Sequence, residues 1–183
     1  MPPGWTSNPS SWPQRIPLVG LALVGFFIAL YLGLFQVGWV PEVWEPFFGR
    51  GSEVILTSEI STVLPIPDAM LGAAGYLADA LAGVIGGSAR WKTMPWMVLL
   101  FGLAVGPLGA VSILLVVLQP VALGTWCTLC LASAVISVAL IGPAMDEVLA
   151  SLQYVRRRQR QGAPLLATLW GASRTQADVR GGP

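Results

Sequence analysis

Histidine is absent from this sequence of 183 residues, cysteine occurs twice, and Lys, Arg, Asp and Glu together make up only 10% of the chain. The absence of histidine excludes His-based acid–base catalysis, a Cys–His dyad and imidazole ligation of haem. Two thiols provide only half of a tetrahedral zinc site, so we expect no metal and no haem. The formal net charge of +1 gives no reason to expect a nucleic-acid partner.

Hydrophobic residues make up 55% of the chain. Soluble domains usually carry about 25% charged residues, far more than this chain has. Such a composition does not cover a surface that faces water. We therefore predict a one-domain, all-α integral membrane protein that is surrounded by the lipid bilayer.

Four apolar segments predict a four-helix transmembrane bundle, because a helical span needs about 20 apolar residues. Pro107 is expected to kink the third helix, and Gln119 and Pro120 are expected to end it. We place the four helices at residues 16–37, 67–85, 96–118 and from about 125 to 141 or beyond.

The segment 38–64, between the first two helices, is rich in Pro, Trp and acidic residues. Within it, residues 52–63 predict a short amphipathic half-helix with Ser52 as its N-cap. This segment is too short and too polar to span a membrane, so we expect it to be re-entrant or to lie on the surface. Its apolar side would consist of Val54, Ile55, Ile60 and Val63.

The distribution of charge predicts the orientation. Residues 90–92 and 156–160 are basic, whereas the loop 38–64 is net acidic. By the positive-inside rule, we expect a multi-pass protein of the inner (cytoplasmic) membrane with both termini in the cytoplasm. The expected organisation is a polar N-terminal segment (1–15), a transmembrane domain (16–145), and a cytoplasmic basic tail (146–183) with an interfacial apolar patch at 165–170.

Cys127 and Cys130 lie three residues apart at the start of the predicted fourth helix. On a helix, residues i and i+3 share a face and are close enough for a disulfide after a small adjustment. The first turn also stabilises a thiolate through its free N–H groups and the helix dipole. We interpret the pair as redox-active and place it on the outer, oxidising side of the membrane. The alternative is two small, buried hydrophobic residues with a structural role.

Two motifs of the chain together point to a known family. One is Cys127-Thr128-Leu129-Cys130 followed by Leu131-Ala132-Ser133-Ala134. The other is Ser52-Glu53-Val54-Ile55-Leu56-Thr57-Ser58, then Pro65-Ile66-Pro67-Asp68-Ala69-Met70-Leu71-Gly72 and Gly75-Tyr76. Over about residues 16–145, the chain resembles the bacterial members of the vitamin K epoxide reductase family. The resemblance implies a four-helix bundle with a half-helix in the first outer loop and a Cys-x-x-Cys at the outer start of the fourth helix.

The same resemblance implies a quinone-linked thiol–disulfide oxidoreductase. Cys130 would face a bound quinone, and Cys127 would be the exchanging thiol. In the family, a second cysteine pair in the outer loop relays electrons from a thioredoxin-like partner. Here Ser52 stands at the position of the second loop cysteine, and the loop contains no cysteine. The internal relay is therefore missing, because serine does not form a mixed disulfide.

Two main interpretations remain open. In the first, Cys127 exchanges directly with a thioredoxin-like or other external thiol protein. In the second, the chain is a non-catalytic accessory subunit of a larger membrane complex that reuses this fold. A transporter or channel is disfavoured, because the sequence lacks paired intramembrane charges and inverted repeats.

Four further residues are candidates for the site. Tyr76 and Ser58 are candidates for hydrogen bonds to a quinone carbonyl, with ordinary packing and helix capping as the alternative. Asp79 lies inside the second predicted helix, where an acid is functional by default, but it is only about two turns from the cytoplasmic interface. Asp68 lies in the first turn of that helix, where stabilisation by the helix dipole is a sufficient explanation.

Overall fold

The computed structural model describes residues 5–61 and 65–171, and the regular structure within these ranges is helical. The long helices are α1 (Trp12–Gln36), α3 (Asp68–Val84), α5 (Pro95–Leu118) and α6 (Thr128–Arg160). The short ones are α2 (Gly51–Leu56), α4 (Arg90–Thr93), the π-helical turn η1 (Gln119–Leu123) and α7 (Leu165–Leu169).

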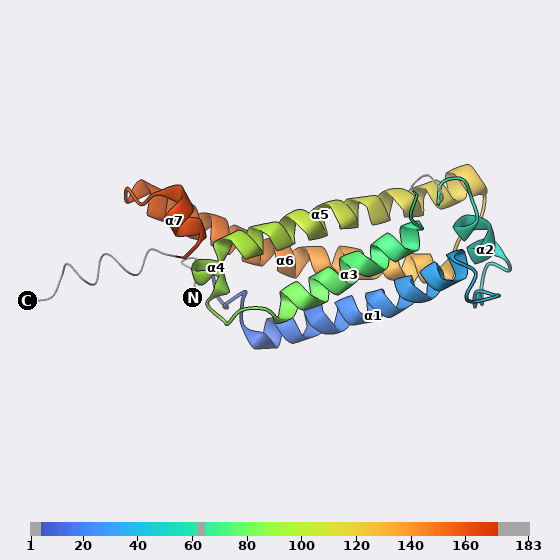
Figure 1. Ribbon diagram of the computed structural model, residues 1–183, viewed down its shortest axis with the longest axis horizontal. Coiled ribbons are helices and arrows are strands. Elements are labelled where there is room, and N and C mark those ends of the chain that lie inside the picture. Colours follow the sequence, from blue (N-terminus) through green and yellow to red (C-terminus); the bar gives the residue numbers. More distant parts are fainter. Residues whose placement is uncertain (1–4, 62–64, 172–183) are drawn as a thin grey trace, which may run out of the picture.

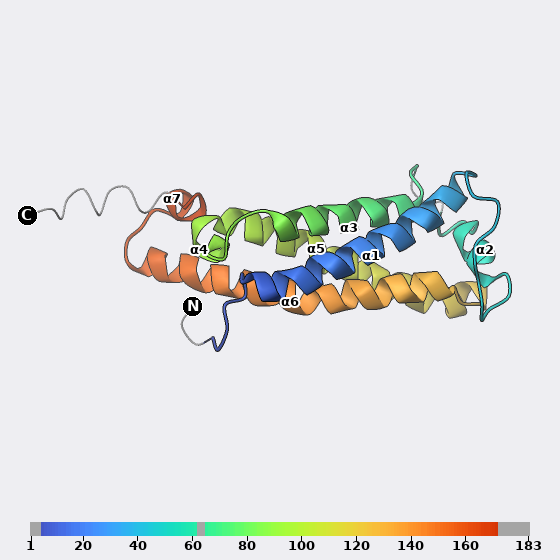
Figure 2. The ribbon, with the colours of Figure 1, turned by 90° about the horizontal axis from the view of Figure 1, so that it is seen from below.

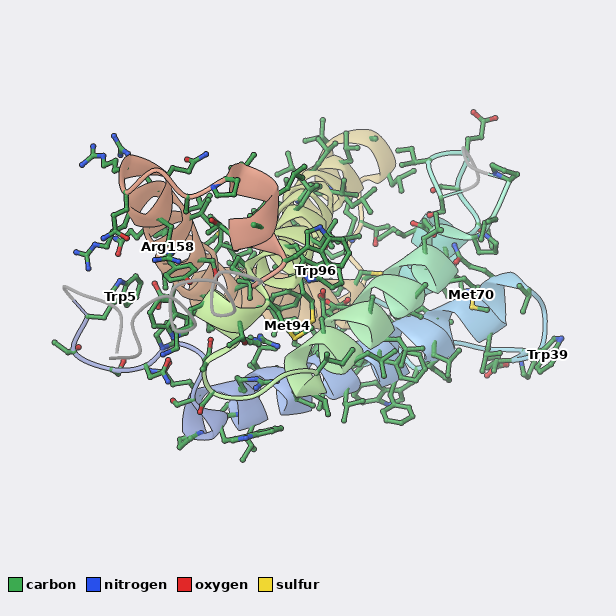
Figure 3. The ribbon with its side chains drawn as sticks, turned by 60° about the vertical axis from the view of Figure 1, so that its left-hand side comes forward. Trp5, Trp39, Met70, Met94, Trp96 and Arg158 are labelled. Atoms are coloured by element: carbon green, nitrogen blue, oxygen red, sulfur yellow. A yellow bond between two sulfur atoms is a disulfide. The ribbon has the colours of Figure 1, made fainter. Side chains whose placement is uncertain are left out.

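The four long helices run side by side along the molecule, with α1 packed mainly on α3 and α5 mainly on α6 (Figure 1). Helix α2 lies at one end of the bundle, and α4 and α7 lie at the other, as the perpendicular view also shows (Figure 2). We call these the α2 end and the α4 end. Trp39 lies at the α2 end and Trp5 at the α4 end (Figure 3), which fits aromatic belts at two membrane surfaces.

Within residues 5–61 and 65–171, three helical segments are long and apolar enough to cross a membrane: Trp12–Gln36, Pro95–Leu123 and Thr128–Arg160. Large apolar side chains are exposed on them, as expected for contact with lipid. Helix α3 is shorter, with 17 residues. The chain is thus a multi-pass membrane protein with an all-helical bundle, and the fourth crossing by α3 stays a prediction.

Small residues let α1 and α3 approach each other closely. A Cβ atom on Gly25 of α1 would lie 2.6 Å from the ring of Tyr76 of α3, so a larger residue has no room there. The core between the helices combines alanines with larger side chains such as Phe101 and Leu140. Small residues are the usual means of close helix contact in membranes. They bring the hydroxyl of Tyr76 into the interior of the bundle.

At the α4 end, three charged side chains are almost completely buried: Arg15, Arg90 and Glu147. Both arginines donate hydrogen bonds to carbonyl groups at the end of α3 and in the turn after it. The last carbonyl groups of a helix have no partner within the helix, so these side chains satisfy them. Arg90 also forms a buried ion pair with Glu147 of α6, which accepts a further hydrogen bond from Ser10. The sequence indicated Arg90 only as part of a basic turn.

The half-helix is present in the first loop, but α2 has only six residues, and Val63 lies outside the described ranges. Ser52 is not its N-cap. Ser52 lies inside α2, and its hydroxyl donates a hydrogen bond to Glu45 instead. Of the predicted apolar side, Ile55 is buried but Val54 is exposed. The helix is too short for a complete apolar stripe, which needs residues from at least two turns.

The predicted end of the third helix is confirmed, since α5 ends at Leu118, whereas the fourth helix begins at Thr128 rather than near residue 125. Beyond Leu118 the chain continues as η1, because a proline removes only one donor from the first turn of a new helical segment. The break comes at Gly124, whose φ of 64° is left-handed. Helix α6 then begins at Thr128 and runs without interruption through the predicted boundary between membrane domain and tail. Pro107 lies inside α5, which continues past it.

Candidate redox site at the start of α6

Cys127 and Cys130 form a disulfide, with 5.2 Å between their Cα atoms. Cys127 is the N-cap of α6, and its sulfur accepts a hydrogen bond of 3.1 Å from the backbone N–H of Cys130. The prediction of a disulfide at the start of a helix is thus confirmed. The two cysteines differ in exposure, because Cys127 is completely buried (0% exposed) and Cys130 is only partly buried.

Gln119 was missed as a site residue. Its side chain is buried, and its Oε1 accepts a hydrogen bond of 3.2 Å from the backbone N–H of Cys127. This contact joins η1 to the turn that carries the disulfide. A glutamine at the end of an apolar helix was the only signal in the sequence, and it indicated no particular partner.

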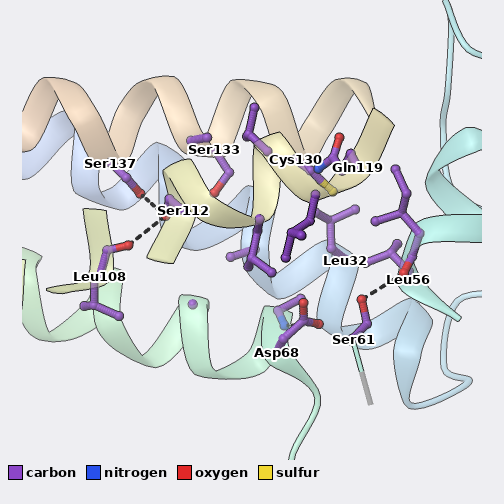
Figure 4. Close-up of a pocket in the computed structure, with 18 of the residues that line it drawn as sticks. Leu32, Leu56, Ser61, Asp68, Leu108, Ser112, Gln119, Cys130, Ser133 and Ser137 are labelled. Atoms are coloured by element: carbon purple, nitrogen blue, oxygen red, sulfur yellow. Dashed lines mark hydrogen bonds between the residues drawn. The ribbon is translucent and has the colours of Figure 1, made fainter. Parts of the chain in front are cut away.

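A cavity of about 130 Å³ lies inside the bundle, next to the disulfide, and Cys130 forms part of its wall (Figure 4). The four other candidate residues also line it: Ser58, Asp68, Tyr76 and Asp79. Most of the remaining wall consists of aliphatic side chains, and α5 contributes more of them than any other helix. The structure therefore brings all these candidates except Cys127 to one cavity.

Tyr76 is the centre of a cluster of hydroxyl groups on this wall. Its hydroxyl donates to the backbone carbonyl of Ser133 and shares a 2.7 Å hydrogen bond with Ser137. Ser137 in turn accepts a hydrogen bond of 3.1 Å from Ser112 of α5 (Figure 4). Ser133 lies one turn after Cys130 on α6, so the cluster begins directly below the disulfide. These serines could not be assigned to the site from the sequence.

Asp79 is buried in the interior rather than reaching the interface. It is 4% exposed and lines the cavity one turn beyond Tyr76. Among the described residues, its Oδ1 has no hydrogen-bond partner. A buried, unpaired carboxyl oxygen is costly unless it is protonated or meets a ligand. Asp79 is thus the polar group on this wall that has capacity for a further partner.

Asp68 and Ser58 lie at the α2 end of the cavity. Asp68 lies in the first turn of α3, as predicted, and accepts a 2.6 Å hydrogen bond from Gln36. The hydroxyl of Ser58 donates to the carbonyl of Ile55 over 2.7 Å. Both side chains are thus already engaged in local hydrogen bonds. For Ser58, this is the capping role that the sequence left open as the alternative to quinone binding.

Glu45, which the sequence did not mark, reaches from the first loop to the start of α6. Its carboxylate accepts hydrogen bonds from the hydroxyl of Ser52 and from both the backbone N–H (2.9 Å) and the hydroxyl of Thr128. Burial by itself raises the pKa of Glu45. The hydrogen bonds from Ser52, Thr128 and the N–H of Phe47 outweigh burial and lower this pKa from 4.5 to about 2. Glu45 is therefore charged at neutral pH.

The contacts of Glu45 should resist mild acid. Because the pKa of Glu45 is lower in the folded state, its stabilising contribution is complete above about pH 4.5 and is lost only as the pH falls through about 2. We expect hydrogen-exchange protection of the Thr128 amide, corrected for intrinsic rates, to be equal at pH 7 and about pH 5. In Glu45→Gln the protection should be lower at both. Loss of protection in the wild type by pH 5 would contradict this.

The family model of the vitamin K epoxide reductase family matches residues 16–144 of the chain. The chain belongs to the vitamin K epoxide reductase family. No curated protein and no solved structure gives a significant match. Membership in the vitamin K epoxide reductase family implies thiol–disulfide oxidoreductase chemistry, and this chain has the disulfide-bonded Cys-x-x-Cys that such chemistry needs.

Vitamin K epoxide reductases typically use a quinone, and the cavity fits one in its chemistry. Ligand sites are mostly apolar with a few polar groups that fix orientation. The aliphatic walls suit a hydrophobic ring, and Tyr76 and the unpaired oxygen of Asp79 provide polar groups. Cys130 lines the same space, so a reacting sulfur and a place for an acceptor adjoin each other.

Proposed function

We propose that this protein passes electrons from an external dithiol, through Cys127 and Cys130, to a quinone in the cavity. The observation that carries the proposal is the position of the disulfide, one sulfur of which lies on the wall of a largely apolar cavity inside a membrane bundle. Cys127 is not among the residues that line the cavity. This asymmetry supports Cys127 as the exchanging cysteine and Cys130 as the one that faces the quinone.

The two half-reactions balance. The external dithiol reduces the Cys127–Cys130 disulfide by exchange, becomes a disulfide itself and transfers two electrons and two protons to the pair. The pair then returns to the disulfide. A quinone, when bound, supplies the acceptor for two electrons and two protons. Tyr76 and Ser58 would orient it by hydrogen bonds once their hydroxyl groups turn away from the carbonyl groups of Ser133 and Ile55, and the aliphatic walls would exclude water from the reacting sulfur.

The exchange must take place directly at Cys127, because the loop has no cysteine to relay it. Ser52, at the position of the second loop cysteine, instead donates a hydrogen bond to Glu45. Its hydroxyl is too weak a nucleophile and leaving group for thiol–disulfide exchange.

A turnover measurement tests the proposal. The purified protein, first reduced and freed of reductant, is mixed with a short-chain naphthoquinone, and quinol is followed by its absorbance. We expect one quinol for each disulfide formed in the wild type, and none in Cys127→Ser or Cys130→Ser. Reduced wild-type protein whose thiols persist in excess quinone would overturn the proposal.

The alternative is a non-catalytic accessory subunit of a larger membrane complex. One observation favours it: Cys127 is completely buried, so the sulfur that should meet an external partner is covered. The two candidates differ in what the protein binds, a thiol protein in the first case and a stable membrane assembly in the second.

We propose that the α2 end faces the outside of the cell, with both termini in the cytoplasm. The charge asymmetry of the loops supports this orientation. In a variant without native cysteines, we expect a membrane-impermeant maleimide to label a cysteine at exposed Phe47 in intact cells, but to label one at exposed Ser88 only after lysis. Labelling of the Ser88 position alone in intact cells would reverse the orientation.

We further propose that Asp79 holds a proton on its side chain for transfer in the cavity. An amide at this position can still donate a hydrogen bond but cannot supply a proton. Asp79→Asn should therefore bind the quinone within about twofold of the wild type, measured by quenching of tryptophan fluorescence. The rate of quinol formation should fall at least about 100-fold, a typical loss for a missing general acid.

Asp68→Asn is the matched control for Asp79. It makes the same chemical change on the wall of the same cavity, but at a residue that already accepts a hydrogen bond from Gln36. We expect its rate to stay within a few-fold of the wild type. Equal rates in the two variants would remove the proton role from Asp79.

A further inference from the structure

Glu45 holds three separate segments together at the mouth of the disulfide. It belongs to the loop after α1, accepts a hydrogen bond from Ser52 of α2, and accepts two from Thr128, the first residue of α6. Within its own loop, it also accepts 3.3 Å hydrogen bonds from the N–H groups of Phe47 and Phe48. We call Glu45, Ser52 and Thr128 the latch.

The latch covers the cysteine that should meet the external partner. Cys127 is 0% exposed. The start of α2 lies directly on the chain before it, because a Cβ atom on Gly51 would lie 2.2 Å from the carbonyl oxygen of Trp126. Only a glycine allows this approach. An external thiol therefore reaches Cys127 only after α2 and the loop move away from the start of α6.

The latch also places a negative charge at the N-terminus of α6. Without that charge, this helix terminus would stabilise a thiolate. Free N–H groups and the helix dipole at an N-terminus favour an anion. Thr128 lies between the two cysteines, and its N–H is already occupied by the Glu45 carboxylate. Any thiolate formed when the disulfide is reduced would therefore lie next to an existing anion, which repels it. The uncharged disulfide avoids this repulsion.

We propose that Glu45 is a positioning residue for the redox pair: it closes the loop and α2 over Cys127 and, through its charge, favours the disulfide over the dithiol. This proposal rests on the proposed function only in taking Cys127 as the cysteine that exchanges with an external thiol. Glu45 makes and breaks no covalent bond. Opening of the latch is the step that admits the partner.

The test uses the full-length protein in detergent micelles and dithiothreitol as the reductant, with no quinone and no partner protein. Two quantities are measured by mass spectrometry after alkylation: the rate of disulfide reduction, and the fraction reduced at equilibrium in mixtures of reduced and oxidised dithiothreitol. The control is Glu42→Gln, which removes the same charge from an exposed position in the same loop.

We expect Glu45→Gln to be reduced at least about tenfold faster than the wild type. Its equilibrium should also shift about three- to tenfold toward the dithiol, where tenfold corresponds to about 30 mV. Glu42→Gln should stay within twofold in both quantities. Equal behaviour of the two variants overturns the proposal.

Ser52→Ala separates the two parts of the role and guards against misfolding of Glu45→Gln. It loosens the latch but keeps the carboxylate, so we expect faster reduction with an equilibrium within twofold of the wild type. If Glu45→Gln does not fold, an unchanged rate in Ser52→Ala overturns the proposal. Because no quinone is present, failure here leaves the turnover experiment unaffected, and failure of turnover leaves this result unaffected.

Discussion

Replacing Glu147 by glutamine should lower the free energy of unfolding by about 3–5 kcal/mol, the usual cost of removing one partner from a buried ion pair. Arg90 and Glu147 are 1% and 2% exposed, respectively, and pair directly with each other. In the glutamine variant, the buried guanidinium keeps neutral partners, such as the carbonyl groups of Ala82 and Ile85, but loses its counter-charge. The loss is measured as the change in midpoint of urea unfolding in mild detergent.

Asp146→Asn is the matched control, because it makes the same chemical change at the exposed neighbouring residue. We expect it to change stability by at most about 0.5 kcal/mol. A double-mutant cycle with Arg90→Gln should show a coupling energy of about 1–3 kcal/mol between the two side chains. A Glu147→Gln variant as stable as Asp146→Asn would show that the ion pair does not support the α4 end.

The ion pair also shows what the sequence could not predict. Arg90 and Glu147 are 57 residues apart, and each lies in a segment that local composition describes simply as polar or basic. A charge in such a segment is usually solvated. It is the packing of α4 against α6 that turns both side chains inward, toward the C-terminus of α3.

The disulfide was predictable for the opposite reason. Its two residues are three apart, so helix geometry alone determines that their side chains meet. The long apolar helices were predictable for the same reason, because length and composition are local properties of the chain. The end of α5 at Leu118 was also predicted, from Gln119 and Pro120. The π-helical turn η1 that follows was not, since it depends on how Gln119 packs against the disulfide turn.

The cavity falls between these cases. The motif that contains Tyr76 indicated the residue, but not its partners Ser133 and Ser137, which lie 57 and 61 residues away. Glu45 is an extreme case, with Thr128 as its partner 83 residues along the chain. Residues that contact the disulfide from other elements are therefore found only after the bundle is assembled.

The largest functional effect is expected from Cys130→Ser. The resolving thiol is then missing, so a mixed disulfide between Cys127 and an external dithiol protein does not break down, and the adduct should accumulate. Cys127→Ser should trap at least about tenfold less, because Cys130 lies on the wall of the cavity inside the bundle. The amount of adduct in each variant is measured by non-reducing electrophoresis of membranes. The variant with both cysteines replaced by serine gives the background.

The complete burial of Cys127 makes this trap decisive between the two candidate functions. If the protein is an oxidoreductase, the latch must open in the membrane, and Cys130→Ser then gives a covalent adduct without a stoichiometric assembly. In an accessory subunit the cover over Cys127 is permanent. The same membranes then give no adduct in either variant, and the wild type co-purifies in mild detergent with other subunits that pack on its exposed apolar helix faces. Adding Glu45→Gln to Cys130→Ser should increase the adduct further in the first case and change nothing in the second.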